Sequence, residues 1–346
     1  MKTEEMKSTR LKTGLTQVYI NPPGKTNFAP YGLALRASGY GLRSLITRFR
    51  AHELADGEAG AMGFLAPNLD IDASALKSGL NDSGMVKSAA EAAFQNAAKA
   101  AIAGAYDIVV LDGVLDLVMQ DSISVSVSEI LMLMREKAMH VELLLTGSDT
   151  ADEILEKAHL ITEMKVHRET PGGHGSRVEV VTGSGKGKTT YCLGKALLMS
   201  GMGVPSFMLQ LIKSPRLYGE VMASQNLPGM QIQSMGKGLV GKRDPEVNTD
   251  HKKAAREAWR NAKEVVMSRR YGLVVLDEIN IAVNYGFIGP EEVLGLIAGI
   301  PNELRLMLSG RYAHSEIVDA ATLAVEMKMI KHPYEIGVKA RKGIEY

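Results

Sequence analysis

The chain has 346 residues, of which 45% are hydrophobic and 23% charged, and its formal net charge is +1. This balance is typical of a globular protein large enough for two domains, and it argues against nucleic acid as a partner. A single cysteine, Cys192, excludes a disulfide framework and a cysteine-rich metal site. No apolar run reaches the length of a membrane span and the charged N-terminus is unlike a signal peptide, so we expect a cytoplasmic protein without membrane contact.

The first recognisable element, residues 18–41, reads VYINPPGKTNFAPYGLALRASGYG. A strand-like run that leads into Gly-Lys-Thr is typical of a phosphate-binding loop. Pro22 and Pro23, however, stand where such a loop needs backbone N–H groups, and proline has none. The pattern therefore predicts a phosphate-loop framework whose chemistry is damaged.

The same framework recurs without a gap at residues 180–203, which read VVTGSGKGKTTYCLGKALLMSGMG. Two further blocks repeat in the same order, because 94–118 matches 259–283 and 143–165 matches 306–328. These ordered blocks share the short sequences Val-Val-Leu-Asp and Glu-Met-Lys, which indicates an internal duplication rather than two unrelated α/β domains. We predict a first domain over 1–169, a glycine-rich linker over 170–176 and a second domain over 177–346.

Each copy alternates short apolar runs with helix-patterned segments, which predicts an α/β fold with a mainly parallel sheet and helices on both faces. The order of strand, loop and helix favours two tandem RecA-like domains of the P-loop NTPase type. In the second copy, we expect strands at 177–181, 204–212, 230–235, 271–277, 304–309 and 323–329, and helices after the loop and over roughly 249–270, 290–299 and 314–321. Gly201 is expected to end the helix that follows the loop.

The loop of the second copy, TGSGKGKTT, contains the residues expected to bind nucleotide. Its glycines let several backbone N–H groups point at an anion. We expect Lys188 to reach the terminal phosphates as a catalytic charge and Thr189 to offer its hydroxyl to Mg²⁺. Thr182 replaces the first glycine of the standard pattern, so the loop is a variant, and the alternative is a glycine-rich turn with an exposed lysine. The predicted nucleotide-binding residues are Thr182, Gly183, Ser184, Gly185, Lys186, Gly187, Lys188, Thr189 and Thr190.

Polar side chains also follow other predicted strands of the second copy. Asp277 and Glu278 end an apolar run, so they lie at the carboxyl edge of the sheet, where we expect them to hold Mg²⁺. For Glu278, the alternative is a solvated loop acid. Arg311 is either a catalytic clamp on phosphate oxygens or a surface arginine, and Lys213 is a second, weaker candidate of the same kind.

The first copy has lost most of the groups that would hold phosphate or metal. Of the candidate groups, only Asp112 remains. We therefore expect the first domain to be a structural or regulatory partner without an intact nucleotide site. The replacements are Thr26 for Lys188, Gly113 for Glu278 and Ser148 for Arg311.

The second copy resembles the P-loop ATP:corrinoid adenosyltransferases, which act on cob(I)alamin or cob(I)yrinic acid a,c-diamide. The resemblance covers about 177–346 and rests on TGSGKGKTT, FMLQLIK, VVLDEINIAV, LSGR and above all the closing EMKMIKHPYEIGVKARKGIEY. It implies that Co(I) of a bound corrinoid attacks C5′ of ATP and that triphosphate leaves, in adenosylcobalamin biosynthesis or salvage. Lys188 and Mg²⁺ would then stabilise charge on the leaving group, with Thr189 and Glu278 as metal ligands.

The resemblance also implies partners. Because cobalt must be reduced to Co(I), we expect an electron-donating reductase or a flavodoxin-like protein. Family members are commonly homodimers, so the first copy is expected to replace a partner subunit in an intrachain pseudo-dimer. After Met-Gly-Lys-Gly, the family often has a Phe-x-Trp stretch that packs on the corrinoid. Residues 239–241 are Leu-Val-Gly here, so Leu239 is expected to give the corrinoid apolar contact without an aromatic plane.

Two other classes of function share parts of this pattern. A RecA-like ATPase motor or switch would use Glu278 to polarise water and would release ADP and phosphate. A corrinoid or nucleotide sensor would bind its ligand without turnover. The C-terminal sequence favours the transferase over both alternatives.

Overall fold

The computed structural model describes residues 10–76, 83–119, 125–170, 177–238 and 245–346. The strands of the first copy are β1 (Thr16–Ile20), β2 (Ser44–Arg48), β3 (Leu69–Asp72), β4 (Ile108–Asp112), β5 (Glu142–Gly147) and β6 (Leu160–Glu169). Its helices are α1 (Ala29–Ser38), α2 (Glu58–Leu65), α3 (Ser83–Ile102), α4 (Val114–Val118), α5 (Val127–Glu136) and α6 (Asp152–Lys157), with 3-10 turns η1 (Ala55–Gly57) and η2 (Ser74–Leu76).

The second copy repeats this order. Its strands are β7 (Val178–Thr182), β8 (Ser206–Gln210), β9 (Met230–Ser234), β10 (Leu273–Asp277), β11 (Arg305–Ser309) and β12 (Leu323–Lys331). Its helices are α7 (Lys188–Gly201), α8 (Gly219–Ser224), α9 (Pro245–Met267), α10 (Ile279–Asn284), α11 (Pro290–Gly299) and α12 (Ser315–Ala320), and η3 (Pro333–Ile336) follows the last strand. Each strand and helix expected in this copy is present. Helices α8 and α10 were not predicted, because six residues are too few to show a helical period.

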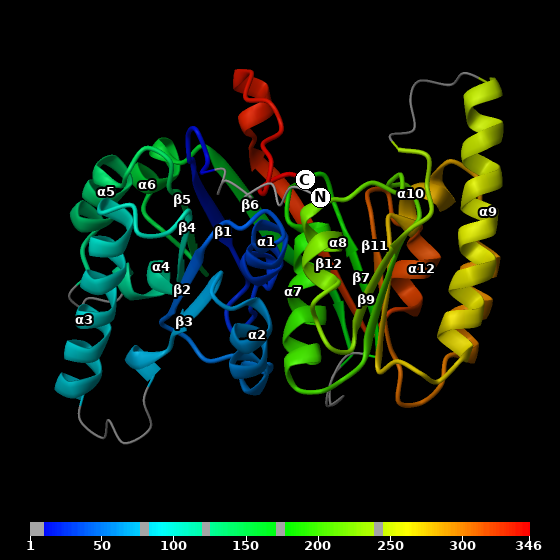
Figure 1. Cartoon of the computed structure of the whole chain (residues 1–346), viewed down its shortest axis with the longest axis horizontal. Coiled ribbons are helices and arrows are strands. Elements are labelled where there is room, and N and C mark those ends of the chain that lie inside the picture. Colours follow the sequence, from blue (N-terminus) through cyan, green and yellow to red (C-terminus); the bar gives the residue numbers. More distant parts are fainter. Residues whose placement is uncertain (1–9, 77–82, 120–124, 171–176, 239–244) are drawn as a thin grey trace, which may run out of the picture.

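All strands of the described residues join in one sheet, in the order β3-β2-β4-β5-β1-β6-β12-β7-β11-β10-β8-β9. The mainly parallel α/β architecture is confirmed, and the copies form neighbouring halves of this sheet (Figure 1). That the two halves join in a single sheet was not predicted. They do so through an antiparallel pairing of β6 with β12, in which Met164 lies beside Met327. The pairing satisfies backbone groups that a free edge strand would expose.

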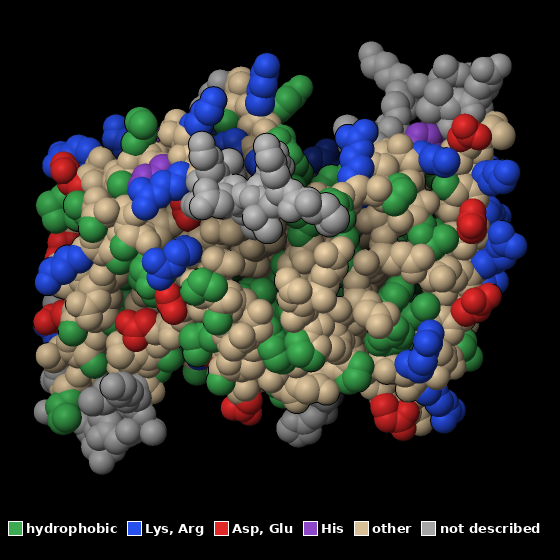
Figure 2. Space-filling model, viewed as in Figure 1, with side chains coloured by type: hydrophobic (Ala, Val, Ile, Leu, Met, Phe, Trp, Pro, Cys, Tyr) green, Lys and Arg blue, Asp and Glu red, His purple; other side chains and the backbone are tan. Residues whose placement is uncertain are grey.

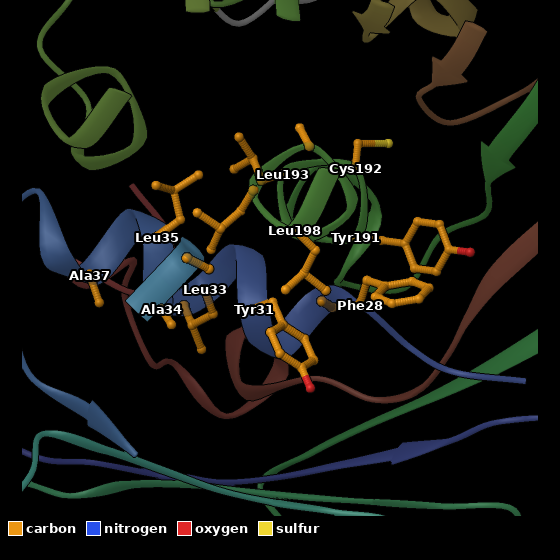
Figure 3. Close-up of a cluster of buried hydrophobic side chains, with 14 of the residues drawn as sticks. Phe28, Tyr31, Leu33, Ala34, Leu35, Ala37, Tyr191, Cys192, Leu193 and Leu198 are labelled. Carbon is orange, nitrogen blue, oxygen red and sulfur yellow. The ribbon is translucent and has the colours of Figure 1, made fainter. Parts of the chain in front are cut away.

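Helices cover both faces of the sheet. Helices α3 to α6 pack on an apolar cluster of the first half, and α9 to α12 pack on one of the second half. On the opposite face, α1, α2, α7 and α8 share a third cluster to which both copies contribute (Figure 3). Figure 2 shows few charged side chains over the centre of this face, where these four helices lie. Among the described helices, none is both long and apolar enough to cross a membrane.

Helix α1 crosses α7 so closely that their backbones touch. A Cβ atom on Gly32 would collide with the carbonyl oxygen of Thr190, and a Cβ on Gly194 would collide with that of Phe28. Gly32 matches Gly194 in the aligned copies, and Phe28 matches Thr190. Each contact is therefore repeated with the two copies exchanged, which is the signature of an approximate twofold axis between them.

A second reciprocal contact lies near the ends of these helices. A Cβ on Gly39 would collide with the carbonyl oxygen of Gly219, and a Cβ on Gly201 would collide with that of Gly57. Gly201 is the last residue of α7, as expected, but its lack of a side chain is needed for this contact. These glycines stand at matched positions in both copies because each half of the interface needs them, independently of the phosphate-loop chemistry.

We expect Gly194→Ala to lower the free energy of unfolding by about 2 kcal/mol or more, since the added methyl group must push α1 away from α7. Urea denaturation measures the change. Gly295→Ala is the matched control, because Gly295 lies exposed within α11 and a Cβ there meets no atom within 4 Å. That control should be neutral or stabilising by up to about 1 kcal/mol. Equal effects of the two substitutions would contradict the close crossing.

Candidate functional site

The phosphate loop of the second copy joins β7 to α7, which begins at Lys188. Gly183 and Gly187 adopt φ angles of 102° and 111°, a region that side chains disfavour. The N–H of Gly185 donates a hydrogen bond of 2.6 Å to the carbonyl oxygen of Met327, and a Cβ on Gly185 would approach that oxygen to 2.7 Å. The loop sequence therefore needs glycine for its conformation and for its close approach to β12.

Asp277, at the end of β10, connects the loop to the neighbouring strands. Its Oδ1 accepts hydrogen bonds from Thr189 Oγ1 at 2.9 Å and from Ser309 Oγ at 2.6 Å. The Asp277 side chain is completely buried. The structure thus brings together Thr189 and Asp277, as the sequence predicted, because the carboxyl ends of β7, β10 and β11 meet at one edge of the sheet.

Glu278 follows with a left-handed backbone, at φ 64°, and its N–H donates to Ser309 Oγ at 3.2 Å. Its Oε2 atom is buried and has no hydrogen-bond partner among the described residues. Burial and the neighbouring Asp277 raise the pKa of Glu278 to about 7. Burial lowers the pKa of Lys188 to about 8, and its Nζ donates to the Gly185 carbonyl oxygen at 2.7 Å.

These groups fit a divalent cation that is shared with a nucleotide. The described residues hold no cluster of three His, Cys, Asp or Glu side chains that would form an all-protein metal site. Mg²⁺ typically takes one or two carboxylates and completes its shell with water and substrate phosphates. The unpartnered oxygen of Glu278 beside Asp277 and Thr189 matches that donor set.

A cavity of about 320 Å³ opens over the loop. Arg311 and Lys213 both line it, and Arg311 is otherwise exposed. The residues of the second copy that line the cavity are Gly185, Lys186, Gly187, Lys188, Thr189, Thr190, Lys213, Glu278, Arg311, His332, Ile344 and Glu345.

Three predicted loop residues do not line this cavity. Thr182 Oγ1 accepts a hydrogen bond from the N–H of Ala313 at 3.2 Å, and Ser184 Oγ accepts one from the N–H of Met329 at 3.4 Å. Thr182 and Ser184 thus fix the loop against neighbouring segments, while Gly183 shapes its turn. Leu239, the predicted corrinoid contact, lies outside the described residues.

The first copy also contributes to this cavity, through residues that were not predicted individually. Gln17 and Tyr19 of β1 and Leu33 and Arg36 of α1 form part of its wall. Tyr19 OH donates to Gln17 Oε1 at 2.9 Å, which orders the two side chains. The only signal in the sequence for Gln17, Tyr19 and Arg36 is that they interrupt an apolar framework. Alignment of the two copies does not reveal which loop these residues face.

In the first copy, a guanidinium group fills the corresponding loop. Arg50 donates hydrogen bonds to the carbonyl oxygen of Lys25 and, at 3.3 Å, to Thr26 Oγ1. A Cβ on Gly113 would lie 2.8 Å from Arg50 Cγ, so a glutamate at that position would displace Arg50. The loop of the first copy therefore offers oxygen atoms to the guanidinium group of Arg50, in contrast to the glycine-rich loop of the second copy.

Asp112, the carboxylate that the first copy retains, keeps the hydrogen bond that joins two strand ends. Asp112 Oδ1 accepts from Thr146 Oγ1 at 2.7 Å, as Asp277 accepts from Ser309 in the second copy. Ser148, at the position of Arg311, donates instead to Asp116 Oδ1 at 2.6 Å. The bonds that hold the strand ends together have thus survived in the first copy.

The α/β sheet, the variant phosphate loop and the carboxylates at the strand ends are the features of the P-loop class of proteins. A family model described as ATP:corrinoid adenosyltransferase BtuR/CobO/CobP matches residues 12–173 and, a second time, residues 174–346. The chain belongs to this family. The two successive matches are consistent with a tandem duplication.

Two relatives that are corrinoid adenosyltransferases agree with this assignment. A corrinoid adenosyltransferase of Sinorhizobium sp is 34% identical over 170 residues, which cover 48% of this chain and 78% of that protein. One from Escherichia coli (strain K12) is 33% identical and covers 48% and 84%. An uncharacterized protein of Nostoc sp. is 27% identical over 378 residues, 100% of this chain and 98% of that protein. A solved KaiC-like protein from Pyrococcus horikoshii covers 46% of this chain and 76% of its own, at 14% identity and a TM-score of 0.30, which is too low to add to the argument.

Proposed function

We propose that the second copy transfers the 5′-deoxyadenosyl group of ATP to Co(I) of a corrinoid and releases triphosphate, in adenosylcobalamin biosynthesis or salvage. The observation that carries this proposal is the intact phosphate loop beside Asp277 and the unpartnered Glu278, in a chain that matches the adenosyltransferase family twice. We place the reaction in the cytoplasm. An electron-donating reductase or flavodoxin-like protein would supply Co(I).

In this reaction, negative charge develops on the triphosphate as the C5′–O bond breaks. The loop N–H groups, Lys188 and Arg311 lie around the cavity where that charge would form. Oriented donors and cations in a partly buried site stabilise such a transition state without reorganising at the moment of reaction. Mg²⁺, when bound by Thr189, Asp277 and Glu278, would neutralise part of the phosphate charge.

The rival proposal is hydrolysis of ATP, and the buried Oε2 of Glu278, which has no hydrogen-bond partner among the described residues, is the observation that favours it. A carboxylate oxygen of this kind is suited to accept a proton from water. Product analysis separates the two reactions. With ATP, Mg²⁺ and a chemically reduced corrinoid, the full chain should yield adenosylcorrinoid and triphosphate in equal amounts. ADP and phosphate without adenosylcorrinoid would establish the hydrolase instead.

We expect Glu278→Gln to raise the Mg²⁺ concentration that gives the half-maximal rate by about tenfold or more, because a neutral amide is a poorer ligand for a hard cation. Initial rates of adenosylation across a Mg²⁺ titration measure this effect. Glu316→Gln is the control, since Glu316 is exposed in α12. If both variants keep the Mg²⁺ dependence of the unmodified protein, Glu278 is not a metal ligand.

We also propose that the first copy takes the place of a partner subunit, which makes the chain an intrachain pseudo-dimer. The reciprocal contacts between α1 and α7, and the placement of Tyr19 and Arg36 in the cavity wall, support this proposal. A short linker keeps the two copies at high effective concentration. The first copy is then free to lose its nucleotide chemistry as long as its packing surface remains.

A further inference from the structure

The C-terminal segment, residues 337–346, follows η3 and makes contacts with the first copy near the boundary between the halves (Figure 1). Arg36 Nη1 donates hydrogen bonds to the carbonyl oxygens of Ile344 at 3.0 Å and Glu345 at 3.2 Å. Arg341 binds the completely buried carboxylate of Glu142 through two nitrogens, at 2.7 and 2.9 Å. A helix residue and a strand residue of the first copy thus hold the segment at two points.

The same segment reaches the phosphate loop from its other side. The Glu345 carboxylate accepts a hydrogen bond of 2.7 Å from Lys186 Nζ and one of 2.7 Å from the N–H of Arg341. Ile344 and Glu345 also line the nucleotide cavity. The C-terminal segment therefore connects the first copy to the catalytic loop of the second.

Arg36 links this segment to a further cavity residue. Its Nε donates to Glu220 Oε2 at 2.9 Å, and Glu220 Oε1 accepts from Lys213 Nζ at 2.7 Å. Burial alone would raise the pKa of Glu220, but Arg36 and Lys213 hold it well below its usual value. Loss of Arg36 would thus disturb the Lys213 side of the cavity together with the C-terminal segment.

The residues that hold the segment have no equivalents in the second copy. Leu198 stands at the position that matches Arg36, and Arg305 stands at the position that matches Glu142. Conversely, the first copy runs from its last strand into the 170–176 linker and has no counterpart of the closing sequence EIGVKARKGIEY. The docking surface occurs only on the copy without an intact loop, and the docked segment only on the copy that has one.

We propose that the first copy serves as an anchor for the C-terminal segment of the second copy, through Arg36 and Glu142, and so holds Ile344 and Glu345 against the nucleotide-binding loop. The proposal builds on the proposed function only in taking that loop as the nucleotide site. Arg341 is a positioning residue, because it acts through the segment and Lys186. Arg36 positions the segment and, through Glu220, Lys213, and its own side chain also lines the cavity. Without the anchor, one wall of the cavity opens and Lys186 loses its partner.

The test uses the full chain with either Arg36→Leu, which installs the residue of the matching position, or Arg341→Gln. Hydrogen exchange of the amides of residues 341–346 reports release of the segment, and equilibrium dialysis with MgATP reports the dissociation constant. We expect exchange at least about tenfold faster and a dissociation constant about tenfold higher. Arg256→Gln is the control, since Arg256 also donates two hydrogen bonds to one glutamate, Glu292, on the far helices α9 and α11. This pair is more exposed than those of Arg36 and Arg341 and lies away from the cavity, so its loss should change neither quantity.

Unchanged exchange of the segment in both variants would overturn the anchor. Faster exchange with an unaltered affinity for MgATP would overturn its role at the nucleotide site. Arg341→Gln guards against misfolding, because Arg341 lies on the segment itself and is partly exposed, whereas Arg36 is buried in the interface. If the unmodified protein forms no adenosylcorrinoid but both variants release the segment and bind MgATP more weakly, the proposed function fails and the anchor stands.

Discussion

Lys188→Ala is expected to lower the rate of adenosyl transfer by about two orders of magnitude or more, the usual cost of losing a preorganised charge at a developing anion. Lys188 begins α7 at the phosphate loop, and only 8% of its surface is exposed. Because little water reaches Lys188, solvent cannot easily provide the stabilisation that its charge gives to the leaving triphosphate. The measurement is the initial rate at which ATP and a chemically reduced corrinoid form adenosylcorrinoid, at saturating Mg²⁺.

Lys25→Ala provides the control for this prediction. Lys25 belongs to the Gly-Lys-Thr sequence of the first copy, but its amino group forms an exposed ion pair of 2.5 Å with Glu169. Exposed pairs of this kind contribute little to stability, so the rate should be nearly unchanged. Comparable losses from the two substitutions would reject the assignment of catalysis to the second copy alone.

The second large effect is expected when residues 176–346 are produced without the first copy. The separate fragment would expose the face of α7 that packs on α1, where the Tyr191 ring lies 5.7 Å from that of Phe28. It would also leave β12 without β6 and the cavity without Tyr19 and Arg36. Since burial of apolar surface is the main favourable term in folding, we expect an unstable or aggregating fragment with at least about tenfold lower activity.

Sedimentation, thermal unfolding and adenosylation assays of the fragment measure these effects. Adding residues 1–169 in trans should restore part of the stability and activity if the two copies still recognise each other. A fragment that forms a dimer through α7 and β12 would also support the pseudo-dimer, because the same surface would then be self-complementary. A well-folded and fully active monomer would show that the first copy is dispensable.

Much of the site was predictable because its determinants are local. The loop, the apolar runs of β7 and β10 and the residues that end them are each contained in a few consecutive positions. The rule that parallel strands bring their carboxyl ends to one edge then places Thr189 beside Asp277, as observed at 2.9 Å. The duplication was equally predictable, since short sequences that repeat in the same order can be recognised without tertiary information.

The sequence by itself therefore determined the α/β class, the repeat and the loss of loop chemistry in the first copy. Only the tertiary structure decided that β6 pairs with β12, that Arg50 fills the first loop and that Arg36 holds the carbonyl of Ile344, 308 positions away. Such contacts leave no periodic pattern in the sequence, because any two distant segments of suitable polarity can satisfy each other's hydrogen bonds. Which segments meet is fixed by the packing of whole helices and strands, and here by glycines that let α1 and α7 approach within backbone contact.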